Sequence, residues 1–346
     1  MYKDYEEYLL QQLEKLIAIP SPSGFFYAIE EYLTGEIQAI GFEPKRLCKG
    51  GLQYCLGGEG NAVMLMAHAD TLGAQVKYIK PDGRMMLAPV GGLNPNNIET
   101  ENVTVFTRFN GAYEGTILLE NASTHVNKQY NVARTFESNL ELVLDKLVSS
   151  REDVERLGIR NGDFVVLHPR FRISTDGFIK SRFLDDKIGV AILLAFSKYV
   201  KEQNVRLNRK AYISFSVYEE VLHGGGTGIP QDVTELLGLD MGCVGQNLDG
   251  GETKVSIVAR DNYGPYNYQM ITTLADLCIK NGIDYAIDCY SGYISDVVTA
   301  LIAGNDVRHG LIGPGVYASH SYERTNLKAV EGTFRLLDAY LTCGQR

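Results

Sequence analysis

The run Ala62-Val63-Met64-Leu65-Met66-Ala67 is wholly apolar and too short to be a typical helix. A strand that is buried on both faces has this composition, whereas a strand with one wet face alternates apolar and polar residues. Strands buried on both faces are typical of parallel sheets that helices cover on both sides. The run therefore predicts an α/β domain built around this strand.

The segments on either side of the run continue the pattern of an α/β domain. Apolar residues at helical spacing predict a helix over residues 5–18, and the Pro-Ser-Pro-Ser-Gly stretch at 20–24 ends it. A second helix is expected over residues 28–40, before Gly41, which is a typical helix-ending residue. Later segments predict a strongly apolar helix over 188–199, a strand over 211–217 and a last helix over about 327–341.

Residues 72–170 differ from this pattern. Short β-like segments at 103–106 and 116–119 are separated by glycines at positions 83, 91, 92 and 111. We therefore expect a catalytic α/β domain formed by residues 1–71 and 171–346. A small β-rich domain, residues 72–170, is expected to interrupt it in sequence.

Charge and cysteine spacing narrow the classes of function. The formal net charge of −9 gives no attraction toward nucleic acid or anionic lipid, so neither partner is expected. The six cysteines are scattered, with no C-x-x-C pair, which favours reduced thiols. The first residues lack the pattern of a secretory signal, and no apolar run approaches the roughly 20 residues that span a bilayer. These features predict a cytoplasmic protein.

Imidazole and carboxylate groups follow several predicted strands at the point where each strand ends. His68 and Asp70 follow the apolar run, Glu219 and Glu220 follow the strand at 211–217, and Asp240 follows a short run at 236–239. Asp185 opens the helix that begins before residue 188. Ligands of open parallel sheets bind at the carboxyl ends of the strands, so we expect these side chains to meet there.

Each of these residues also has an ordinary structural interpretation. A single histidine is more often a hydrogen-bonded core residue than a ligand, and Asp185 or Asp186 could be a helix N-cap. Their convergence favours a metal site, because clustered carboxylates repel one another unless a cation lies among them. Residues two apart on a strand share a face, so Asp70 could accept the second ring N–H of His68 and fix its tautomer.

Five separated motifs carry a resemblance to a known family. They are His68-Ala69-Asp70, residues 183–189, residues 218–221, Leu239-Asp240 and residues 319–323. Their order and spacing resemble the tetrahedral (TET) aminopeptidase family of dinuclear metallopeptidases, which includes glutamyl and deblocking aminopeptidases and some members labelled endoglucanases. Residues 89–92 and 151–163 resemble the dimerisation domain of that family.

The resemblance implies a zinc-aminopeptidase-like sheet covered by helices, and an inserted β-rich dimerisation domain. It implies two divalent ions, zinc or cobalt, bridged by Asp185. His68 and Asp240 would complete one site, and Glu220 and His320 the other. Glu219 would be the general base. Since neighbouring residues on a strand point to opposite sides, Glu219 and Glu220 should have different roles. The substrates would be short peptides, and dimers would assemble into a dodecamer that encloses the active sites.

Other interpretations stay open at this stage. An N-acyl amino acid deacylase or another amidohydrolase could use the same pair of ions, and a non-catalytic binding protein could keep the fold. Two segments depart from the family pattern, residues 221–226 and residues 293–297, which include Ser295 and Asp296. His223 is expected in a surface loop, and Gly224-Gly225-Gly226 is expected to be a flexible turn.

Overall fold

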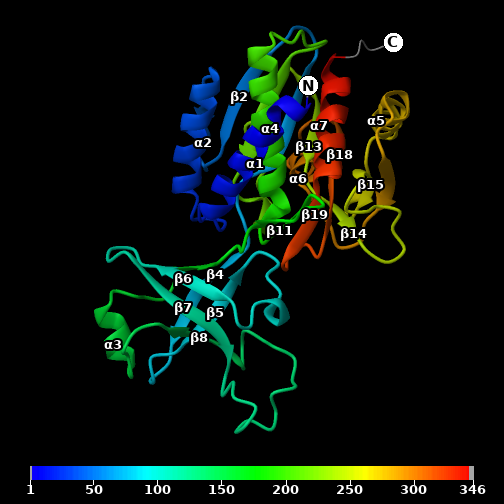
Figure 1. Ribbon diagram of the computed structural model, residues 1–346. Helices are drawn as coiled ribbons and strands as arrows, with labels where there is room; N and C mark the ends of the chain where they lie inside the picture. Colours follow the sequence, from blue (N-terminus) through cyan, green and yellow to red (C-terminus); the bar gives the residue numbers. More distant parts are fainter. Residues whose placement is uncertain (1, 343–346) are drawn as a thin grey trace. The chain divides into compact units, whose positions relative to one another are not determined.

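The computed structural model describes residues 2–342 and divides into two compact units (Figure 1). One unit consists of the chain up to Asp70 and from Phe171 onward, and the other is Thr71–Arg170. One of the six cysteines, Cys343, lies outside the described residues.

The first unit is built on a 13-stranded sheet whose centre is the apolar run. β3 (Ala62–His68) is buried along its whole length and pairs in parallel with β12 (Ala211–Ser216) and β13 (Val233–Leu239). β13 pairs in parallel with β18 (Arg308–Tyr317). The α/β fold predicted from the sequence is therefore confirmed. Because these four strands run the same way, their carboxyl ends lie at one edge of the sheet.

The remaining strands extend this sheet on both sides. The order along its main path is β1-β2-β12-β3-β13-β18-β19-β11-β10, and β14 to β17 pair beside β18 and β15. Their bounds are β1 Lys45–Arg46, β2 Leu52–Gly57, β10 Arg172–Ile173, β11 Phe178–Ser181, β14 Gly242–Val244, β15 Val255–Asp261, β16 Gly264–Pro265, β17 Tyr285–Cys289 and β19 Glu323–Asn326.

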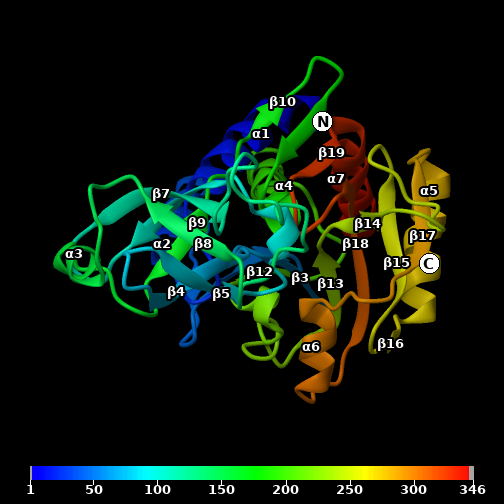
Figure 2. The same cartoon turned by 90° about the horizontal axis from the view of Figure 1, so that it is seen from below.

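Helices cover both faces of the central strands. Figure 2 shows α4 (Leu184–Glu202) and α6 (Asp296–Ile302) on opposite sides of β3 and β13. α4 is buried along most of its length because α1 and α7 pack over it. The other helices of this unit are α1 Tyr2–Ala18, α2 Tyr27–Ile40, α5 Tyr268–Asn281 and α7 Leu327–Thr342. α2 ends at Gly41, whose φ of 102° lies in the left-handed region that glycine adopts without strain.

The second unit is a small closed barrel with strand order β4-β5-β8-β7-β6-β9. Its elements are β4 Gly73–Ile79, β5 Met85–Val90, the 3-10 turn η1 Pro95–Asn97, β6 Asn102–Phe106, β7 Ala112–Leu119, β8 Leu140–Leu144, α3 Arg151–Arg156 and β9 Phe164–Leu167. Alternate residues such as Val103, Val105 and Ile117 are fully buried, as expected for strands that enclose a core. The β-rich character predicted for the insertion is thus confirmed. Its role in dimerisation stays a prediction.

Among residues 2–342, none of the helices is both long enough and apolar enough to cross a membrane.

Candidate metal centre

The side chains predicted to form a site come from five separate segments of the first unit. His68 is the last residue of β3, and Asp240 directly follows β13. Asp185 lies at the start of α4, where the backbone is not yet helical. Glu220 lies in the 3-10 turn η2 (Glu219–Val221), which follows β12, and His320 lies between β18 and β19. The fold therefore brings all five to the edge where the parallel strands end.

These five side chains form two groups that share Asp185. The potential ligand atoms of His68, Asp185 and Asp240 all lie within 4.8 Å of one another, as do those of Asp185, Glu220 and His320. One carboxylate oxygen of Asp185, Oδ1, lies 3.0 Å from His68 Nε2, and the other, Oδ2, lies 3.6 Å from His320 Nε2. His320 Nε2 also lies 3.6 Å from Glu220 Oε2. The two oxygens of Asp185 therefore face different histidines.

Glu219 lies beside the first group, with Oε2 3.7 Å from His68 Nε2. The expectation that Glu219 and Glu220 differ because they alternate on a strand rests on the wrong local structure. β12 ends at Ser216, and both residues belong to the 3-10 turn η2. They still diverge, because Glu219 approaches His68 whereas Glu220 approaches His320.

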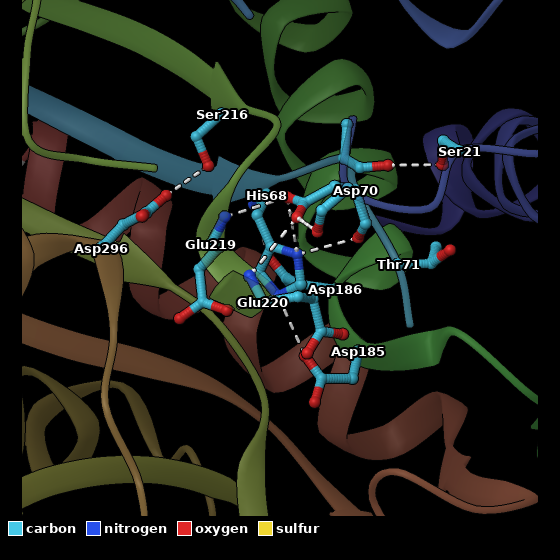
Figure 3. Close-up of polar contacts among 12 residues, drawn as sticks. Ser21, His68, Asp70, Thr71, Asp185, Asp186, Ser216, Glu219, Glu220 and Asp296 are labelled. Atoms are coloured by element: carbon cyan, nitrogen blue, oxygen red, sulfur yellow. Dashed lines mark hydrogen bonds and ion pairs between the residues drawn. The ribbon is translucent and has the colours of Figure 1, made fainter. Parts of the chain in front are cut away.

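Asp70 is completely buried and holds several parts of the centre together (Figure 3). Its two carboxylate oxygens accept the backbone N–H groups of Glu219 (3.2 Å) and Glu220 (3.3 Å). The Ser23 hydroxyl donates to it at 2.5 Å. His68 Nδ1 is closer to the Asp70 backbone oxygen (3.0 Å) than to its carboxylate (3.6 Å). An Nδ1–H donated to either oxygen leaves the Nε2 lone pair facing Asp185.

Burial and mutual repulsion determine the proton affinities of the acids. Burial, with the charge of Asp185, raises the pKa of Asp240 to about 7. Burial also raises the pKa values of Glu219 and Glu220 well above the usual range, and neighbouring carboxylates add to both shifts. Burial opposes the charge on His68, yet Glu219 and the other nearby carboxylates raise its pKa well above the usual value.

The donor set fits a pair of divalent cations. The raised pKa values mean that, without cations, some of these acids keep their protons. Those protons offset the repulsion among the carboxylates. Divalent ions placed within the two groups would offset the same repulsion and allow the acids to ionise. Two imidazole nitrogens and three carboxylates are a mixed N/O set that suits zinc or cobalt.

Two further buried acids support the centre, and sequence reasoning gave them no part in it, although Asp186 was considered as a helix N-cap. Glu323 accepts the backbone N–H groups of Asp185 and His320, both at 3.1 Å. Asp186 accepts those of His68 (3.2 Å) and Gly189 (3.1 Å). Each lies in or next to a recognised motif, which is the signal that could have drawn attention to it. The hydrogen bonds that Asp186 and Glu323 accept from distant backbone N–H groups leave no pattern in the sequence.

Known proteins resemble this chain over nearly its whole length. A family model described as M42 glutamyl aminopeptidase matches residues 50–336. The protein YhfE of Bacillus subtilis (strain 168), provisionally named an aminopeptidase, is 41% identical over 334 residues, which are 96% of each chain.

Solved structures share the fold. The TET aminopeptidase of a marine sediment archaeon of the Thaumarchaeota has a TM-score of 0.88 at 18% identity and covers 98% of this chain and 97% of its own. Pyrococcus horikoshii TET1 peptidase, described as assembling into a tetrahedron or a large octahedral shell, has a TM-score of 0.84 at 23% identity. Its match covers 96% of this chain and 98% of its own.

Divalent ions should stabilise the wild type much more than a variant that lacks Asp185. We expect zinc or cobalt to raise the unfolding midpoint of the wild type, because an ion at 100 times its dissociation constant stabilises a folded protein by about 2.7 kcal/mol. Asp185→Ala should lose most of this shift, since one residue serves both groups. Thermal unfolding of chelator-treated protein, with and without added ions, measures the effect.

Glu235→Gln is the matched control for this measurement. Glu235 is another buried acid, but it lies near the start of β13, bonded to Tyr340 and Arg209, away from the centre. It should keep the full metal-dependent shift. An equal shift in Asp185→Ala and the wild type would contradict the shared position of Asp185.

Proposed function

Since this chain belongs to the M42 glutamyl aminopeptidase family, we propose that the five side chains around Asp185 hold two divalent ions for the hydrolysis of N-terminal peptide bonds. The observation that carries this proposal is the position of Asp185, whose two oxygens face different histidines. Peptidases of this family are metal-dependent, and the chain is accordingly a metal-dependent aminopeptidase.

Each ion would have its own set of ligands in addition to the shared aspartate. His68 and Asp240 would hold one ion, and Glu220 and His320 would hold the other, either zinc or cobalt. A bound pair of this kind lowers the pKa of a water molecule and polarises the scissile carbonyl.

Glu219 is the proposed general base. Its carboxylate lies beside the first group but belongs to neither set of potential ligands, so it stays available for proton transfer. It would take a proton from the attacking water and return it to the leaving amine. Asp70 holds Glu219 at its backbone N–H and would keep the carboxylate in reach of the water. The His320 side chain is 39% exposed, so peptides would approach from its side of the centre.

We make further proposals on the assembly, substrates and compartment of this protein. Short peptides are the proposed substrates, and we propose that the barrel unit joins chains into dimers that build a dodecamer. Two solved TET structures support this, because one is described as a dodecamer and the other as assembling into a tetrahedron or a large octahedral shell. Light scattering should then give a mass of twelve chains, and a mass of two chains would rule out the dodecamer.

We also propose that the protein functions in the cytoplasm. The free cysteines at positions 48, 55, 243, 278 and 289 support this, because thiols stay reduced in that compartment.

Replacing the proposed base should remove turnover while the metal centre stays intact. We expect Glu219→Gln to lower kcat by roughly 10²–10⁴-fold, the usual contribution of general acid–base catalysis, with KM little changed. The assay uses aminoacyl-p-nitroanilides with zinc or cobalt, and metal content is measured on the same samples.

N-acetylated forms of the same anilides are the matched substrates. Release of acetate from the acetylated forms, with no release of nitroaniline from the free amines, would indicate the deacylase alternative. A Glu219→Gln variant as active as the wild type would contradict the role of Glu219.

A further inference from the structure

Asp296 lies outside both ligand groups, yet it is bonded to both ends of the chain segment that contains Glu219 and Glu220. It is the first residue of α6 and is 5% exposed. One carboxylate oxygen accepts the Ser216 hydroxyl at the end of β12 (Figure 3). The other accepts the backbone N–H of Gly225 at 2.6 Å. Residues 216–225, named here the glutamate loop, are therefore closed by a single side chain.

The interior of the glutamate loop is held by further hydrogen bonds. The N–H of Leu222 donates to the Glu219 carbonyl at 2.7 Å, and that of His223 donates to the Tyr218 carbonyl at 3.1 Å. The rings of Tyr218 and His223 stack with their centroids 4.8 Å apart. Asp70 binds the middle of the loop at the backbone of its two glutamates. Asp70 thus fixes the centre of the loop, and Asp296 fixes its ends.

The glycines of the loop allow α6 to approach this closely. A Cβ at Gly224 would lie 2.4 Å from Asp296 Oδ1 and 2.9 Å from the backbone nitrogen of Glu219. A Cβ at Gly225 would lie 2.2 Å from the Asp296 carbonyl oxygen. The expectation of a flexible turn at positions 224–226 is therefore wrong for Gly224 and Gly225, which are packed against Asp296.

We propose that Asp296 is a positioning residue that sets the places of Glu219 and Glu220 by fastening both ends of the glutamate loop. The inference rests on the proposed function, in which these two residues are the general base and a metal ligand. It assigns a role to the aspartate of the segment 293–297, which this chain keeps although its neighbours in that segment differ from the family pattern. Asp296 acts through its hydrogen bonds and does not contact the substrate.

Comparing Asp296→Asn with Asp296→Ala separates the effect of the hydrogen bonds of Asp296 from the effect of its charge. An amide can accept the Gly225 N–H through its oxygen and donate to Ser216 Oγ through its nitrogen, so Asp296→Asn keeps both contacts. Asp296→Ala removes both. We expect Asp296→Ala to lower cobalt affinity and kcat by about 10–100-fold, as loss of groups that orient metal ligands usually does, while Asp296→Asn stays close to the wild type.

Cobalt titration followed by visible absorption is the readout that does not depend on turnover. Because Glu220 belongs to the loop, Asp296→Ala should change the spectrum of the bound cobalt, and KM should change less than kcat. The Cβ that Gly224→Ala adds would clash with the Asp296 carboxylate. This variant should therefore give the same change in the cobalt spectrum. This second variant keeps the test valid if Asp296→Ala does not fold.

Glu235→Gln is the control for a general loss of stability. Glu235 lies five residues before Asp240 along β13, about 17 Å away at the usual rise of a strand, and its variant should keep the wild-type cobalt spectrum. An unchanged spectrum and affinity in both Asp296→Ala and Gly224→Ala would overturn the inference, as would an asparagine variant as impaired as alanine. Wild-type protein that neither binds cobalt nor cleaves peptides would overturn the proposed function itself.

Discussion

Repulsion among buried carboxylates is the constraint on which the rest of the structure depends. Asp185, Asp240, Glu219 and Glu220 gather at one edge of the sheet, and their burial raises the pKa of three of them. Only Asp185, with His68 and His320 beside it, has its pKa lowered against the effect of burial. Either protons or cations must offset the repulsion among these acids, and Asp185 occupies the position that two cations can share.

The fold keeps this cluster of acids in place because it holds the backbone of the segments that carry them, and not only their side chains. β3 and β13 are buried and deliver His68 and Asp240 from rigid neighbours in the sheet. The irregular segments are held by other acids. Asp70 and Glu323 accept the backbone N–H groups of Glu219 and Asp185, and Asp296 accepts that of Gly225 at the end of the glutamate loop. Buried hydrogen bonds of this type are costly to break, so the site is organised before a substrate arrives.

The sequence predicts the fold class and the set of converging residues because both leave local patterns. An apolar run followed directly by His68 marks a buried strand and its end, and Asp240 follows a similar run. The contacts that orient these residues could not be predicted. Ser23 donates to a carboxylate 47 positions away, and Asp296 reaches back 80 positions to Ser216. Hydrogen bonds across such separations have no periodicity. The 3-10 turn at Glu219 also escaped prediction, because the apolar pattern continues to Val217 after β12 has ended.

Anomalous diffraction from crystals grown with zinc or cobalt tests the central claim most directly. Two peaks should appear, roughly 3.5–4 Å apart as in other dinuclear sites, each beside a different oxygen of Asp185. Their other neighbours should be His68 and Asp240 for one peak, and Glu220 and His320 for the other. A single peak, or peaks that do not share Asp185, would contradict the account.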